Sequence, residues 1–187
     1  KNPLFLLDVI KKVKDKGCHL KFILLGVGYH SPELEAMKVK MRELDLEDTI
    51  RLEPWISHVD CQEFVRKSLF YISTALYEGL PLAVIEAMAN GKAVIASDVV
   101  GNKDCVQNGE NGYLLPLDTE AYAQKIIQLV NNQELRMKME KYSRDLFLRE
   151  FFIENRISYL QNQYNMVMDM RYGGGQILSF STRALIL

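Results

Sequence analysis

Short apolar runs alternate with amphipathic segments along most of the chain. Apolar side chains recur at helical spacing from Pro3 to Lys16, and the run HLKFILLG that follows is typical of a buried strand. Further strands are predicted in the segments TIRLEPW, LFYISTA, KAVIAS and GYLLPL, and amphipathic helices separate them. Strands that alternate with helices predict βαβ units, so we expect an α/β protein with a mostly parallel sheet covered by helices on both faces.

Individual residues predict where several helices and turns lie. Ser31 is expected to cap the helix in SPELEAMKVKMREL, and Asp60 is expected to cap the helix in VDCQEFVRKS. Asp118 begins another predicted helix, whereas Gly101 and Asn102 predict a turn after the strand KAVIAS. The helical segments QELRMKMEKYSRDLFLREF and IENRISYLQNQYNMVMDM are expected to complete the C-terminal part.

The chain is expected to contain one main domain and a tail. Residues 1–170 are expected to form a single domain with C-terminal helices, because no repeat or low-complexity stretch interrupts them. Gly173 to Gly175 break the helical pattern, and the rest of the 171–187 tail is apolar and strand-like; a foreign sequence and a swapped edge strand both fit it. The first residues, KNPLFLLDVI, enter a helix almost at once, which indicates a piece of a longer protein.

The composition is that of a soluble globular protein and excludes several classes of function. Of the 187 residues, 48% are hydrophobic and 25% are charged, which supports a sizeable core. A net charge of −1 provides no basic excess to neutralise phosphates, so no nucleic-acid partner is expected. The three cysteines are widely spaced, which argues against a disulfide framework or a zinc site and favours a cytoplasmic location.

The stretch YEGLPLAVIEAMANGKAVIASD, residues 77–98, carries the candidate chemistry. Its first residues connect a predicted strand to a helix, at the edge of a parallel sheet where ligands bind. Gly79 is expected to allow a tight turn with space for a ligand, and Pro81 suits the first helical turn. The backbone N–H groups of Leu82 and Ala83 are then expected to be free, and with the helix dipole they would bind a phosphate or diphosphate.

Two glutamates flank this predicted phosphate site. Glu86 lies one helical turn beyond Leu82, on the same face, at a rise of about 6 Å. A carboxylate there can accept hydrogen bonds from two vicinal hydroxyls, as on a ribose, and Glu78 can do the same for a second sugar. A diphosphate with a sugar at each end is a nucleotide sugar. Taken singly each glutamate is more often a solvated charge, so it is the joint pattern that predicts a site.

Glu78, seven intervening residues, Glu86 and the following Ala-Met-Ala-x-Gly resemble the retaining glycosyltransferases of family 4, also called group 1. The segment GNKDCVQNGENGYLLPLD resembles the stretch that usually follows, and ILLGVG, which contains Gly28, resembles the glycine turn of the family. The resemblance covers Lys1 to about Met170. It implies the C-terminal, donor-binding half of the GT-B architecture, with a Rossmann-like parallel sheet flanked by helices.

The resemblance also implies a role for each candidate residue. Glu86 would hold the ribose of the nucleotide, and Glu78 would hold the transferred sugar or its near side. Lys1 resembles a lysine that neutralises the diphosphate together with an arginine, which would fall upstream of this chain. The diphosphate would be bound by the backbone around Gly79, Leu80, Leu82 and Ala83.

Three positions depart from the family pattern. Pro54 stands where the family often has a glycine, in a loop that usually lies against the base, so base selection is open. Trp55 beside it is expected either to stack on the base or to be a half-buried anchor. Ala75 stands near a common serine and Ala93 at a common proline, and we interpret both as packing variation.

The resemblance implies an enzyme that transfers a sugar, with retention, from a UDP- or GDP-sugar to a glycan or lipid-linked acceptor in surface glycan synthesis, with no cofactor required. The acceptor would be bound by an N-terminal domain absent from this chain, so the chain alone is expected to bind nucleotide weakly and to be inactive. A cytoplasmic protein is expected, with peripheral membrane contact of the full-length enzyme. Two alternatives stay open: a sugar-nucleotide 2-epimerase of the same architecture, and a non-catalytic Rossmann-like binding module.

Overall fold

The computed structural model describes residues 1–26, 33–53 and 55–172, and it divides the chain into two compact units, residues 1–149 and 150–187. The described part of the second unit consists mainly of helix α8 (Ile153–Tyr172). Within the described ranges, none of the helices combines the length and the apolar content that crossing a membrane requires. The predicted tail over 171–187, with Gly173 to Gly175, lies almost wholly outside the described residues and stays a prediction.

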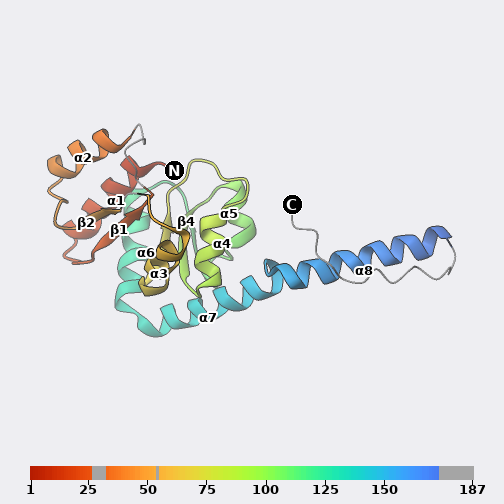
Figure 1. Ribbon diagram of the computed structural model, residues 1–187. Coiled ribbons are helices and arrows are strands. Elements are labelled where there is room, and N and C mark those ends of the chain that lie inside the picture. Colours follow the sequence, from red (N-terminus) through yellow and green to blue (C-terminus); the bar gives the residue numbers. More distant parts are fainter. Residues whose placement is uncertain (27–32, 54, 173–187) are drawn as a thin grey trace. The chain divides into compact units, whose positions relative to one another are not determined.

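The first unit alternates helices and strands, as βαβ units require (Figure 1). Each of the segments predicted as strands contains a strand. In chain order, the elements of this unit are α1 (Pro3–Asp15), β1 (Phe22–Leu25), α2 (Leu34–Glu43), β2 (Ile50–Glu53), α3 (His58–Lys67), β3 (Phe70–Ser73), α4 (Leu82–Ala89), β4 (Ala93–Ser97), α5 (Val100–Cys105), β5 (Gly112–Leu115), α6 (Thr119–Asn131) and α7 (Gln133–Glu150).

Every strand pairing among the described residues is parallel. β1 pairs with β2 from Phe22 opposite Ile50, and β4 lies between β3 and β5. Parallel neighbours need crossover connections, and helices α2, α4 and α5 supply them, as Figure 1 shows. The predicted α/β class with a parallel sheet is confirmed, although the pairings form a two-stranded and a three-stranded sheet instead of one continuous sheet.

The two sheets share one hydrophobic core. Phe22 and Ile50 from the two-stranded sheet belong to the same cluster of buried side chains as Ile95 and Leu115 from the three-stranded sheet. β4 is buried along its whole length, which explains why its sequence, AVIAS, is a nearly continuous apolar run. This buried central strand gives the loops at its carboxyl end a rigid support.

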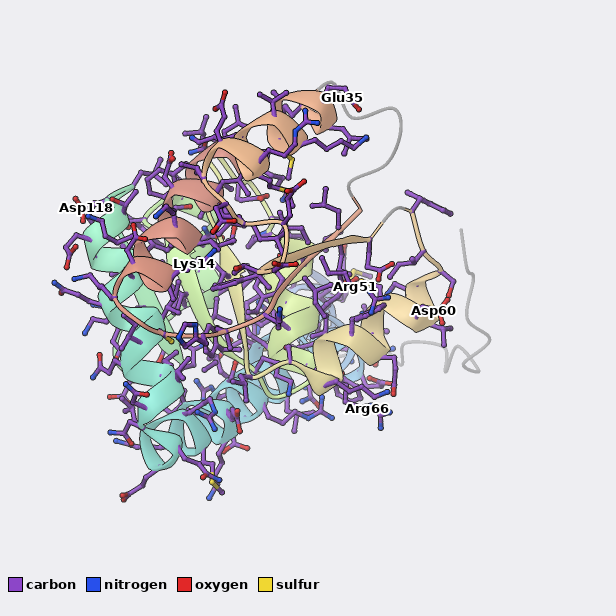
Figure 2. The ribbon with its side chains drawn as sticks, turned by 90° about the vertical axis from the view of Figure 1, so that its left-hand side faces the viewer. Lys14, Glu35, Arg51, Asp60, Arg66 and Asp118 are labelled. Carbon is purple, nitrogen blue, oxygen red and sulfur yellow. The ribbon has the colours of Figure 1, made fainter. Side chains whose placement is uncertain are left out.

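Two predicted helix starts differ from the structure. The cap of α3 is Ser57 instead of Asp60, because the Ser57 hydroxyl oxygen accepts a hydrogen bond from the Asp60 backbone N–H at 3.1 Å. Asp60 lies in the first turn and Arg66 in the last turn of α3, where each charge suits the helix dipole (Figure 2). Ser31, the predicted cap of α2, lies outside the described residues, and α2 begins at Leu34.

The predicted turn at Gly101 and Asn102 is wrong, because both residues lie in helix α5. The side-chain amide of Asn102 is fully buried and donates a hydrogen bond to the Ser97 carbonyl oxygen at 2.9 Å. This contact ties α5 to the end of β4 and overrides the local preference of the Gly-Asn pair for a turn.

Candidate functional site

The 74–81 loop, on which the sequence places the candidate site, connects the carboxyl end of β3 to the start of α4. The Ser97 hydroxyl donates a hydrogen bond to the Ala75 carbonyl oxygen at 2.6 Å. The Gly101 backbone N–H donates to the Glu78 carbonyl oxygen at 2.9 Å. The loop is therefore fixed to the end of β4 and to α5, which are both part of the first compact unit.

Gly101 lets α5 approach the loop backbone closely. A Cβ at this position would lie 2.5 Å from the Gly79 carbonyl oxygen and 2.6 Å from the Glu78 carbonyl oxygen, well inside ordinary contact. Gly79 differs, because its φ lies outside the left-handed region and a Cβ there would meet only the Tyr77 hydroxyl at 3.7 Å. The tight turn predicted at Gly79 therefore does not need a glycine, and only space for a ligand remains as a reason for one.

Glu78 pairs with Lys1, although 77 positions separate them in the sequence. The Lys1 ammonium group donates a hydrogen bond to Glu78 Oε1, and the Glu78 side chain is 11% exposed whereas that of Lys1 is 71% exposed. The Thr74 hydroxyl lies 3.2 Å from the carbonyl oxygens of Lys1 and Asn2. Thr74 thus holds the start of α1 against the loop, and the cation offsets the cost of burying the carboxylate.

The start of α4 offers fewer free N–H groups than the sequence predicts. Pro81 is the cap instead of the first helical residue, and the Leu82 N–H donates to the Leu80 carbonyl oxygen at 3.0 Å, so it is not free. Within the described residues, no backbone or side-chain acceptor pairs with the N–H groups of Gly79, Leu80 or Ala83. These three donors and the positive end of the α4 dipole can receive an anion.

Glu86 projects from α4 toward the first turns of α3. Its Oε1 lies 3.3 Å from His58 Nε2, and the same ring nitrogen lies 3.3 Å from the Gln62 amide nitrogen. The Asn90 amide nitrogen donates to Gln62 Oε1 at 2.6 Å and to the Glu86 carbonyl oxygen at 2.8 Å. The Glu86 side chain is 39% exposed, so the carboxylate reaches solvent in spite of its apolar neighbours in the sequence.

The phenol of Tyr71, in β3, lies within electrostatic range of both glutamates. Burial, followed by the negative charges of Glu78, Cys61 and Glu86, raises the pKa of Tyr71 to about 12. Burial and then the charge of Glu86 also raise the pKa of the Cys61 thiol. Glu78 and Glu86 are therefore both close enough to the Tyr71 phenol to affect its pKa.

The comparison with protein-family models decides the family of the chain. The model of the group 1 glycosyl transferases matches residues 1–146, a range that includes Lys1, Glu78 and Glu86. The chain belongs to the group 1 glycosyl transferases. This match confirms the resemblance seen in the sequence, and it favours neither the epimerase nor the non-catalytic alternative.

A curated relative and a solved structure support the same fold. The poly(ribitol-phosphate) alpha-N-acetylglucosaminyltransferase of Staphylococcus aureus (strain COL) is 28% identical over 162 residues, which cover 86% of this chain and 32% of that protein. A mutant of S. aureus TarM, solved in complex with fondaparinux, alpha-GlcNAc-glycerol and UDP, has a TM-score of 0.79 at 26% identity, over 88% of this chain and 33% of TarM.

A third comparison places the chain within the GT-B architecture. The C-terminal domain of LpcC, a group 1 protein from Francisella tularensis, has a TM-score of 0.71 at 23% identity, over 82% of this chain and 80% of that domain. This likeness concerns the fold alone, and it confirms the predicted C-terminal half of a GT-B glycosyltransferase. The chain spans less than half the length of the curated relatives it matches.

The other residues predicted for the group 1 site have mixed outcomes. Trp55 is 87% exposed, so it is not a half-buried anchor, and its stacking on a base stays a prediction. The side chains of Leu80 and Leu82 are both exposed beside the loop. Gly28 lies outside the described residues, and its role in the glycine turn stays a prediction.

The sequence does not predict a role in the site for four residues that shape it: His58, Tyr71, Thr74 and Gly101. A signal exists for two of them, because Thr74 directly follows β3 and His58 opens the helix that follows β2. Residues at the carboxyl ends of parallel strands share one edge of the sheet and are candidates for a site. Tyr71 and Gly101 act through packing that no local pattern reveals.

Proposed function

We propose that this group 1 chain is the donor-binding half of a retaining glycosyltransferase, which transfers a sugar from a nucleoside diphosphate sugar to an acceptor hydroxyl. The observation that carries the proposal is the arrangement around the start of α4. Among the described residues, the N–H groups of Gly79, Leu80 and Ala83 have no acceptor, and Glu78 and Glu86 precede and follow them along the chain, both close enough to Tyr71 to affect its pKa. Family membership supports the same activity.

Each part of a nucleotide sugar then has a partner of matching chemistry. The N–H groups of Gly79, Leu80 and Ala83 donate hydrogen bonds to the diphosphate. Glu86, with its exposed carboxylate, accepts hydrogen bonds from the ribose hydroxyls. Glu78 accepts hydrogen bonds from hydroxyls of the transferred sugar on the other side of the diphosphate.

Stabilisation of the leaving group is the catalytic contribution that this chain can make. Departure of the nucleoside diphosphate leaves additional negative charge on the diphosphate, where the helix-start donors and Lys1 can stabilise it. Because the Lys1 side chain is 71% exposed, its ammonium group can turn from Glu78 toward the diphosphate. Stabilisation of this kind requires no metal ion, and we propose a transfer without a metal cofactor.

The donor and the acceptor are proposed on separate grounds. TarM, at 26% identity, is solved with UDP, which supports UDP-sugars ahead of GDP-sugars as donors. The acceptor is proposed to be a glycan or a lipid-linked glycan, bound by a further domain, because the chain spans less than half of its curated relatives. A cytoplasmic location with peripheral contact to a membrane would suit such an acceptor.

Titration calorimetry of the chain with UDP, GDP, UDP-glucose and GDP-mannose tests this proposal. Glu86→Gln is expected to weaken donor binding about tenfold or more, because hydrogen bonds to a charged group contribute about 1.5–3 kcal/mol. Glu35→Gln is the matched control on α2 (Figure 2), with a side chain that is 79% exposed, and it should bind like the unmodified chain. If no nucleotide binds even at millimolar concentration, the proposal is wrong.

A further inference from the structure

Asn90, Gln62 and His58 form a chain of hydrogen bonds whose direction is set at one end. The Glu86 backbone carbonyl can only accept, so the Asn90 atom 2.8 Å from it is the amide nitrogen. The same nitrogen lies 2.6 Å from Gln62, so the Gln62 atom there is the carbonyl oxygen. Gln62 therefore turns its amide N–H toward His58 Nε2, 3.3 Å away.

This direction favours one tautomer of neutral His58. In that tautomer Nε2 accepts the N–H of Gln62 and the ring proton lies on Nδ1. Glu86 Oε1, 3.3 Å from the same nitrogen, then faces a lone pair and receives no hydrogen bond from the ring. Among the described residues no other donor pairs with the Glu86 carboxylate, so both of its oxygens are open to the hydroxyls of a ligand.

Protonation of His58 reverses the arrangement. The imidazolium Nε2 carries a proton that it must donate, and the negatively charged Glu86 Oε1 at 3.3 Å is the acceptor beside it. We propose that His58 is a positioning residue for Glu86: neutral, it leaves the carboxylate free for the ribose, and protonated, it occupies the carboxylate and weakens donor binding. This inference rests on the proposed function, because it takes Glu86 as the ribose-binding residue.

Cys61 and Tyr71, the other titratable groups that face Glu86, stay uncharged over the pH range of the test. In α3, burial and then the charge of Glu86 raise the pKa of Cys61 above its ordinary range. In β3, burial and the nearby acidic groups raise the pKa of Tyr71 to about 12. Both groups therefore stay protonated between pH 5.5 and 8, the range in which an imidazole changes its charge.

The segments around Glu86 carry three further charged side chains. Asp60 is in the first turn of α3, and Glu78 forms its pair with Lys1 at the 74–81 loop. Their effect on the donor is common to the unmodified chain and to variants at position 58. A comparison between these proteins therefore isolates the contribution of the ring.

The pH dependence of donor affinity tests the inference. The full chain is titrated by calorimetry with UDP-glucose and, in parallel, GDP-mannose at pH 5.5 and pH 8. Both donors carry a diphosphate diester, which loses no proton in this range. Because His58 is 72% exposed, solvent screens its pair with Glu86, and we expect affinity at pH 5.5 to be about two- to fivefold lower than at pH 8.

Two substitutions of His58 separate positioning from a structural role. His58→Gln cannot become a cation, and it should keep at pH 5.5 the affinity that it has at pH 8. His58→Lys is a cation at both pH values, and it should show the lower affinity at both. His19→Gln, at an exposed histidine that precedes β1, is the control and should retain the pH dependence of the unmodified chain.

The outcomes distinguish this inference from the proposed function. If the pH dependence of donor binding is the same in the unmodified chain and in both His58 variants, the inference is overturned and the proposed function stands. Binding that becomes stronger at pH 5.5 would overturn it as well. Absence of donor binding at every pH would overturn the inference and the proposed function together.

Discussion

Substitution of Gly101 by alanine tests whether α5 positions the loop that carries Glu78. The added Cβ would meet the carbonyl oxygens of Gly79 and Glu78 at 2.5 and 2.6 Å, so loop and helix must separate by about 1 Å to reach ordinary contact. Both contacts are with backbone atoms, which cannot rotate away as the end of a side chain can. The same movement stretches the hydrogen bond from the Gly101 N–H to the Glu78 carbonyl oxygen, now 2.9 Å long.

The expected cost follows from three contributions to the free energy of unfolding. Overpacking costs about 1–3 kcal/mol, and weakening of the hydrogen bond costs about 1 kcal/mol. The better helix propensity of alanine offsets about 1 kcal/mol. The free energy of unfolding of Gly101→Ala should therefore fall by about 1–3 kcal/mol in urea denaturation. Donor affinity should fall too, because Glu78 and the free N–H of Gly79 move with the loop.

Val100→Ala provides the matched control for this experiment. Val100 is the neighbouring residue of α5, but it is 70% exposed, so its substitution should change the free energy of unfolding by less than about 0.5 kcal/mol. If Gly101→Ala is as stable as the unmodified chain and binds donor equally well, then α5 does not position the loop and the reasoning is refuted.

Three other substitutions test neighbouring parts of the structure. Gly79→Ala should leave the free energy of unfolding within about 0.5 kcal/mol of the unmodified chain, because a Cβ there meets only the Tyr77 hydroxyl at 3.7 Å; calorimetry should show weaker donor binding, and unchanged binding would mean that no ligand approaches this backbone. Ser57→Ala removes the α3 cap and should cost about 1 kcal/mol in urea denaturation, whereas equal stability would speak against the cap. Tyr71 keeps its proton to about pH 12 when folded and only to about pH 10 when unfolded, so stability should fall as pH rises from 10 to 12, by about 2 kcal/mol from this group. Tyr71→Phe should lose correspondingly less stability over that range, and an identical loss would show that the phenol is not the group responsible.

The strands and most helices could be predicted because their signals are local. The run AVIAS is apolar throughout because β4 is buried, and Asp118 caps α6 as predicted, since its carboxylate accepts the Ala121 N–H at 2.6 Å. The predicted cap of α3 was wrong, because Ser57 and Asp60 are both good cap residues and only the folded backbone selects Ser57. Helix α5 could not be predicted, because it depends on a buried contact between Asn102 and β4.

Only part of the candidate site could likewise be predicted from the sequence. Glu78 and Glu86 stand out because their spacing resembles a family motif, and helix geometry places Glu86 one turn beyond the helix start. The resemblance assigns Lys1 to the diphosphate and Glu78 to the transferred sugar, but the pair between them was not predicted, since no local pattern joins residues so far apart. The contact of His58 with Glu86 arises from the packing of α3 beside α4, which the sequence does not encode in any short stretch.

The central claim is that a diphosphate binds at the start of α4, between the two glutamates. An NMR titration of backbone amide chemical shifts with UDP-glucose tests it most directly, because it reports on the proposed donors themselves. We predict the largest shift changes at the N–H groups of Gly79, Leu80 and Ala83. Changes that spare these amides and fall elsewhere, for example on the α6 surface around Gln124, would contradict the account.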